Sequence, residues 1–123
     1  MNPALVFYTN RFVGTGNAGN SYGPLVFIRP EYKDDNGLLE HEFQHSRIFW
    51  RSLGFQSLMY LLSDAAKLAQ EVECYKVQIK VTVEERKLNG AQIESLTLKF
   101  AGFIANDYGL SVTTATALRL LTT

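Results

Sequence analysis

The sequence predicts a single α+β domain that is mainly helical and carries a small N-terminal sheet. Two short runs rich in β-branched and aromatic residues, at positions 4–8 and 25–29, predict strands. From Leu38 onward, apolar residues recur at helical spacing. Of the 123 residues, 46% are hydrophobic and 20% are charged, which is typical of a folded chain. No repeat or linker divides the chain, so we expect one domain over residues 1–123.

The segment between the two predicted strands, residues 14–23, is dense in glycine, asparagine and serine. It lacks the Gly-Lys-Ser/Thr sequence of a phosphate-binding loop, and no helical pattern follows it. We therefore expect a flexible hairpin loop here. Pro30 and the polar residues 31–36 end the second strand.

The first predicted helix has Asp35 or Asn36 available as its N-cap and Gly54 as its stop. We expect Phe49 and Trp50 to anchor this helix in the core. The residues that recur at helical spacing in this segment are Leu38, His41, His45, Ile48 and Phe49.

A second helical pattern runs from about Leu58 to Lys87, and Ser63-Asp64 could divide it into two helices. A turn at Asn89-Gly90 precedes a helix over 91–106, and a short helix follows Ser111. The buried stripe expected for the second pattern is Leu58, Leu62, Ala65, Ala69, Val72 and Ile79.

Charge and cysteine content exclude several classes of protein. The 12 basic and 12 acidic residues cancel, and no basic stripe predicts binding to nucleic acid or a membrane. The single cysteine, Cys74, excludes an internal disulfide and a cysteine-rich zinc finger. The N-terminus lacks signal-peptide features, and the longest apolar run elsewhere, 58–62, is too short to span a bilayer. We expect a cytoplasmic protein, with release by lysis as another route.

The motif that points to chemistry is His41-Glu42-Phe43-Gln44-His45, the HExxH pattern, which contains both histidines of the chain. Residues four apart on a helix lie one turn above each other, so the two imidazoles can share one zinc ion. Glu42 is rotated by roughly 100° from His41, where its carboxylate can act as general base on a zinc-bound water. The alternative is an amphipathic helix with two structural histidines.

A catalytic zinc needs a third protein ligand. The metzincin pattern is excluded, because Ile48 and Arg51 occupy the positions where that pattern requires glycine and histidine. With no histidine left, the third ligand must be a carboxylate or, less plausibly, Cys74.

Residues 38–45 and 71–75 together resemble the gluzincin group of HExxH metallopeptidases. In several of those families the third ligand opens a Glu-x-x-Ala-Asp pattern. The resemblance implies a minimal zincin-like domain with Glu71 as that ligand, Cys74 in the place of alanine and Tyr75 in the place of aspartate. The change at Tyr75 removes a carboxylate that would orient a ligating histidine. The chain also looks like short HExxH proteins of phages and bacteria.

Helical geometry leaves Glu73 open as the alternative third ligand. By steps of about 100°, Glu73 lies nearer than Glu71 to the edge of the expected buried stripe, and Cys74 lies opposite that stripe. The plain alternative is that both glutamates are solvated. For the donor to a developing oxyanion the candidates are Tyr75, Tyr60 and Arg47; Tyr75 is preferred because it sits one turn after Glu71.

These features predict a zinc metallopeptidase that cuts a peptide or a peptidoglycan cross-link. The strand at 25–29 could offer a free edge to such a substrate, or could simply cover the motif helix. The alternative function is a non-catalytic, zinc-stabilised interaction or structural protein, possibly encoded by a phage. A peptidase held inactive by residues 14–23 is a third interpretation.

Overall fold

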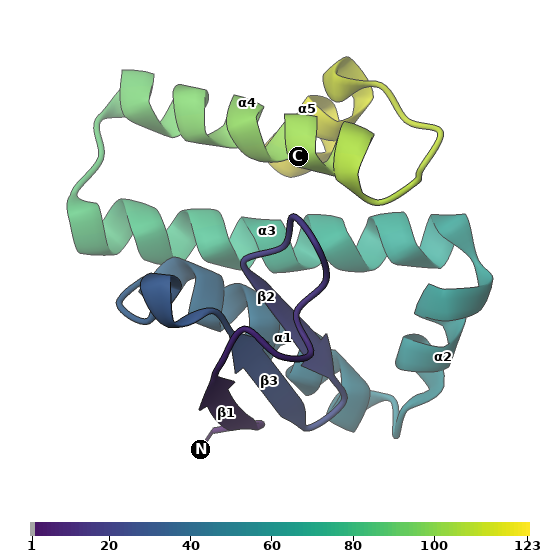
Figure 1. Cartoon of the computed structure of the whole chain (residues 1–123). Coiled ribbons are helices and arrows are strands. Elements are labelled where there is room, and N and C mark those ends of the chain that lie inside the picture. The colour runs from purple at the N-terminus through teal and green to yellow at the C-terminus, as the bar shows by residue number, and fades with distance from the viewer. Residues whose placement is uncertain (1) are drawn as a thin grey trace.

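The computed structural model describes residues 2–123 and shows one small α+β domain. The described chain contains a three-stranded sheet and five α-helices, which confirms the predicted class (Figure 1). The strands are β1 (Leu5–Tyr8), β2 (Gly19–Tyr22) and β3 (Leu25–Ile28). The helices are α1 (Asn36–Arg51), α2 (Phe55–Leu62), α3 (Asp64–Arg86), α4 (Gly90–Asp107) and α5 (Thr114–Thr122).

The prediction of a flexible hairpin loop over residues 14–23 is wrong. That segment contains strand β2, and the strand order is β1-β3-β2. Strand β1 runs parallel to β3, whereas β2 is antiparallel to it, with Gly19 opposite Ile28 and Tyr22 opposite Leu25. Polar and glycine residues form this strand because β3 supplies the pairing, a tertiary effect that outweighs the local turn propensity. Strand β3 is therefore central, and its two edges are both paired.

Helix ends follow local capping chemistry closely. The Asp35 side chain accepts a hydrogen bond from the Leu38 amide at the start of α1, and Ser63 caps α3, which confirms the predicted break there. Asn89 and Gln92 form a capping box at the start of α4. Gly54, expected to stop the first helix, donates its amide to the Phe49 carbonyl at 2.8 Å just after α1 ends, and its φ of 86° leads the chain into α2.

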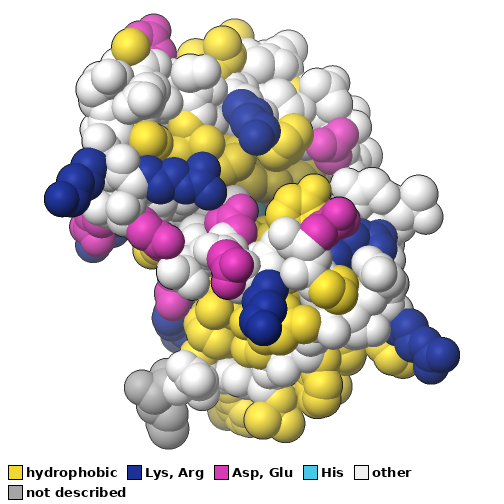
Figure 2. All heavy atoms as spheres, turned by 60° about the vertical axis from the view of Figure 1, so that its left-hand side comes forward, with side chains coloured by type: hydrophobic (Ala, Val, Ile, Leu, Met, Phe, Trp, Pro, Cys, Tyr) yellow, Lys and Arg dark blue, Asp and Glu magenta, His cyan; other side chains and the backbone are white. Residues whose placement is uncertain are grey.

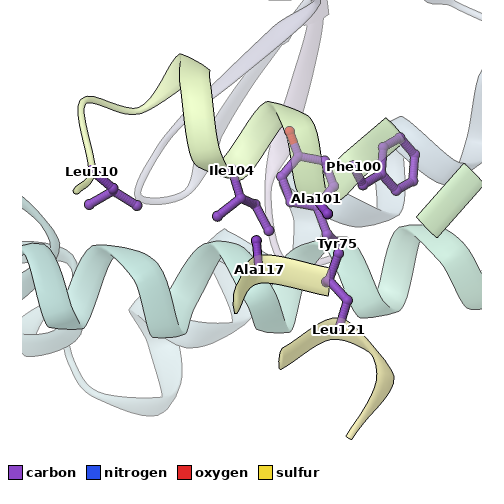
Figure 3. Packing of buried hydrophobic residues seen from close by; sticks show 7 residues of the cluster. All are labelled: Tyr75, Phe100, Ala101, Ile104, Leu110, Ala117 and Leu121. Carbon is purple, nitrogen blue, oxygen red and sulfur yellow. The ribbon is translucent and has the colours of Figure 1, made fainter. Parts of the chain in front are cut away.

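The helices stack above the sheet in layers (Figure 1). Helix α1 lies between the sheet and α3, and α4 and α5 cover the other side of α3. One apolar cluster joins α3, α4 and α5 (Figure 3), and a smaller one joins β3 and α1. Gly37 lets α1 and α3 approach closely, because a Cβ there would collide with the Thr82 hydroxyl. The described elements thus place the motif helix directly against α3.

The predicted burial of two regions is wrong. Trp50 is 52% exposed, and its indole only hydrogen-bonds the Pro3 carbonyl at 2.8 Å. Leu58, Leu62, Ala65 and Ala69, placed in the predicted stripe, are exposed. In α3 most of the buried side chains are polar, so a stripe traced through apolar residues missed them. Helix α2, which contains Leu58 and Leu62, has no buried residue.

Candidate metal centre

His41 and His45 of α1 meet Glu71 of α3, whereas Glu42 lies against β2 beside Gly19. His41 and Glu42 are buried, His45 is largely buried, and the two imidazole rings lie 5.2 Å apart between centroids. Both rings lie on the same side of α1 because four residues make about one helical turn. Helical spacing therefore gives the convergence of imidazoles that the sequence predicted.

Glu71 of α3 completes this convergence. It is 1% exposed, with Oε1 3.3 Å from His41 Nε2 and Oε2 3.2 Å from His45 Nε2. Glu73, which simple helical geometry placed nearer the buried stripe, points elsewhere: its Oε2 accepts a hydrogen bond from Gln44 Nε2 at 2.6 Å. Glu73 also pairs with Arg51 at 3.4 Å. Of the two glutamates, the structure brings Glu71 to the histidines.

Cys74 also lies at this cluster, which corrects its predicted position opposite the buried face. The thiol is fully buried, and the ligand atoms of His41, His45 and Cys74 all lie within 4.8 Å of one another. Burial raises the pKa of the Cys74 thiol to about 11, although His45 acts to lower it. The thiol is therefore neutral at physiological pH unless a cation binds beside it.

Polar neighbours orient the convergent side chains. His45 Nδ1 donates to Gln70 Oε1 at 2.7 Å, which turns Nε2 toward Glu71. The Tyr60 hydroxyl donates to Glu71 Oε2 at 2.6 Å. His41 Nδ1 has no hydrogen-bond partner among residues 2–123, and the Tyr75 ring packs edge-on against His41 at 4.3 Å. Sequence reasoning missed Gln70, for which the only signal was its position immediately before Glu71.

The three predicted oxyanion donors occupy different places. Tyr60 reaches the cluster through Glu71, as described. Tyr75 lines the same cleft, but its hydroxyl hydrogen-bonds the Tyr108 hydroxyl at 2.8 Å. Arg47 is exposed and pairs with Glu40 at 2.8 Å, away from the cluster. Two tyrosines, and not the arginine, therefore lie where a substrate carbonyl could reach them.

The cluster holds a buried ion pair. Burial acts to raise the pKa of Glu71, but His45 and His41 together hold that pKa far below its ordinary value. For His45, burial acts to lower the pKa, yet Glu71 keeps it well above 6.5. Burial is the main cause of the raised pKa of Glu42, which the two histidines partly oppose. Positive charge is thus favoured at the point where His41, His45 and Glu71 meet.

The side chains that meet here are of the types that bind zinc. Among the described residues, His41, His45 and Cys74 have ligand atoms close enough together to hold one metal ion. The two imidazoles also contact Glu71, at different carboxylate oxygens and at ion-pair distances. Glu71 Oε1 has no hydrogen-bond partner among the described residues, although it is buried. Two imidazole nitrogens and a carboxylate oxygen are also donors that zinc prefers.

The cluster opens into a cleft of about 920 Å³. Its walls come from β2 and the preceding loop, from α1 and α3, and from α4. Figure 2 shows the surface hollowed between the part that contains α4 and the part that contains the sheet. This volume is near the upper end for ligand sites and far exceeds the space that a metal ion needs.

A scan against protein-family models finds no match, and searches of curated proteins and of solved structures find no similar chain. Among the described residues, no helix is both long enough and apolar enough to cross a membrane. The function is therefore inferred from the residues of the cleft.

Proposed function

We propose that the protein is a zinc-dependent metallopeptidase with a minimal zincin-like domain. The observation that carries the proposal is the meeting of His41, His45 and Glu71 in one buried cluster, all three being residue types that bind zinc, with Glu42 buried beside them. Three protein ligands leave the fourth tetrahedral position for water, which distinguishes catalytic from structural zinc sites. When bound, the zinc would lower the pKa of that water and polarise a substrate carbonyl.

Glu42 is suited to the role of general base. It lies on the same helix as both histidines, and its raised pKa brings it closer to the neutral range in which proton transfer is efficient. Glu42 would take a proton from the attacking water and then deliver it to the leaving amine. Tyr60 holds the Glu71 carboxylate with its one hydroxyl proton. The Tyr75 hydroxyl, which shares a hydrogen bond with Tyr108, would therefore be the candidate donor to the oxyanion.

Strand β2 would hold an extended substrate in this cleft, in place of the predicted 25–29 strand. The Arg29 amide donates to the Ala18 carbonyl, so by the alternation of an antiparallel ladder Gly19 and Ser21 turn their backbone groups away from β3. Ser21 Oγ donates to the Glu42 carbonyl at 3.0 Å and fixes this edge beside the motif. A peptide could therefore add to the sheet next to the zinc ligands.

Substitution of Glu42 tests the enzyme proposal. Zinc-loaded wild-type protein is incubated with casein, peptide libraries and purified peptidoglycan, and the products are identified by mass spectrometry. Glu42→Gln should retain zinc and lose about 10²–10⁴-fold in hydrolysis. Glu40→Gln is the matched control, because Glu40 lies on the same helix but pairs with Arg47 outside the cluster. Equal hydrolysis by the wild type and Glu42→Gln would contradict the proposal.

Cys74 favours a second candidate function, a structural zinc site in a non-catalytic interaction protein. A fourth protein ligand would close the site to water, and the thiol is near enough to both histidines to supply one. Cobalt substitution separates the two functions. A thiolate ligand gives intense near-ultraviolet charge-transfer absorption that Cys74→Ala abolishes, whereas the peptidase proposal expects no such band and unchanged hydrolysis in Cys74→Ala.

A further inference from the structure

The cleft continues well beyond the zinc ligands along one face of α3. Glu71, Tyr75, Gln78, Thr82 and Arg86 all line it, at intervals of three or four residues. The fifteen helical steps from Glu71 to Arg86 span about 22 Å, which equals about six residues of extended peptide. The cleft is therefore shaped for a chain that passes along α3.

Gln78 is the unusual residue on this face. It is 8% exposed, and its Oε1 has no hydrogen-bond partner among residues 2–123. The other two buried polar atoms without a partner, His41 Nδ1 and Glu71 Oε1, belong to the zinc cluster. Gln78 lies two helical turns from Glu71, too far to contact the same ion. A buried amide oxygen without a partner is destabilising, so its presence on a side chain of the cleft wall points to a ligand.

We infer that the side-chain amide of Gln78 binds a backbone peptide group of the substrate, about three residues from the bond that is cut. The inference rests on the proposed peptidase function. Two helical turns cover about 10 Å, and an extended peptide covers this in about three residues. Rotation about the terminal side-chain bond lets the amide present either its oxygen or its nitrogen to the cleft.

The walls around Gln78 explain why the partner is a backbone group. The edge of β2 on one wall offers hydrogen bonds to the substrate backbone, and Gln78 does the same from α3. The α4 wall contributes Leu96, Phe100 and Phe103, which suit apolar substrate side chains. An uncharged amide that both donates and accepts complements a peptide bond whatever the sequence. The substrate class is thus an extended peptide that reaches at least three residues toward Arg86.

A binding experiment tests the inference without catalysis. Zinc-loaded, ¹⁵N-labelled Glu42→Gln protein is titrated with blocked decapeptides of random sequence. The side-chain amide resonances of Gln78 should shift, and adding Gln78→Met should weaken binding about tenfold. Lys80→Met, the same change on an exposed position of α3, should leave affinity unchanged. Unshifted Gln78 resonances, equal affinity in Gln78→Met, or no peptide binding would each overturn the inference.

A kinetic experiment separates this inference from the proposed function. In a peptide that the wild type cuts, each backbone N–H near the cut bond is replaced in turn by an ester oxygen. An ester placed about three residues from the cut bond should raise the KM of the wild type roughly tenfold with kcat unchanged. The same ester should have no effect on cleavage by Gln78→Met. Cleavage with identical ester profiles in both proteins would overturn the role of Gln78 but support the peptidase. Peptide binding that depends on Gln78, with no cleavage, would support the role of Gln78 but overturn the peptidase proposal.

Discussion

The two sides of α3 bury different chemistry. Toward α4 and α5, Tyr75 joins an apolar cluster with Phe100, Ile104 and Leu121 (Figure 3). Toward α1 and the cleft, the buried side chains are polar: Gln70, Glu71, Cys74, Gln78 and Thr82. The apolar side gains stability simply by excluding water. On the polar side, burial removes water from polar groups, and only hydrogen bonds to specific partners offset that cost. This is therefore the side where a ligand is expected.

Removing bulk from the apolar side should give the largest loss of stability. Ile104→Ala should lower the free energy of unfolding by about 2–5 kcal/mol, because it leaves a cavity in the α3–α4–α5 cluster at a residue outside the cleft lining. Chemical denaturation with and without zinc measures this loss. Leu98→Ala, which alters a 51% exposed residue of the same helix, should change stability far less. An Ile104→Ala loss that disappears when zinc is added would contradict the separation of the two sides.

The polar side should respond to zinc instead. Zinc at a thousand times its Kd should stabilise the wild type by about 4 kcal/mol, because only the folded chain assembles the ligands. Glu71→Gln should lose most of this stabilisation, whereas Glu73→Gln should retain it, since Glu73 contacts Gln44 and Arg51. Thermal denaturation at several zinc concentrations measures both. Equal zinc responses in the two variants would show that Glu71 is not a ligand.

How far the sequence predicts this molecule depends on whether a feature is local. The convergence of His41 and His45 and the caps at Asp35 and Ser63 follow from spacings within one helix, so they were predictable. The buried face of α3 was not, because apolar periodicity cannot show that a helix buries glutamine, glutamate and cysteine. Pattern resemblance favoured Glu71 where periodicity favoured Glu73. Strand β2 was missed because its pairing with β3 is a tertiary interaction.

The orientation of His45 should make a moderate contribution. Gln70→Ala removes the acceptor of the Nδ1 hydrogen bond and should weaken zinc binding about 10–100-fold. Competition with a chromogenic chelator measures the affinity. Gln44→Ala is the matched control, because Gln44 contacts Glu73 and not the histidines. If both variants bind zinc equally well, the hydrogen bond to Gln70 does not position the ligand.

Zinc binding should also depend on pH in a defined direction. The raised pKa of His45 means that its imidazole is protonated below that pKa in the metal-free fold, so zinc must displace the proton. Glu71 contributes no proton, because its pKa is lowered. Below the pKa of His45, affinity should therefore fall up to about tenfold per pH unit. Calorimetry in buffers of different ionisation enthalpy measures the released proton; pH-independent affinity between pH 5 and 7 would contradict this ion pair.

The peptidase proposal depends on the proposed zinc site, and X-ray absorption at the zinc edge tests that site most directly. Protein purified without chelator should hold one zinc with two imidazole nitrogens and oxygen donors at about 2.0–2.1 Å. No sulfur should appear in the coordination sphere, and Glu71→Gln should change the oxygen contribution. Absence of stoichiometric zinc, or a sulfur ligand at about 2.3 Å, would contradict an open site formed by His41, His45 and Glu71.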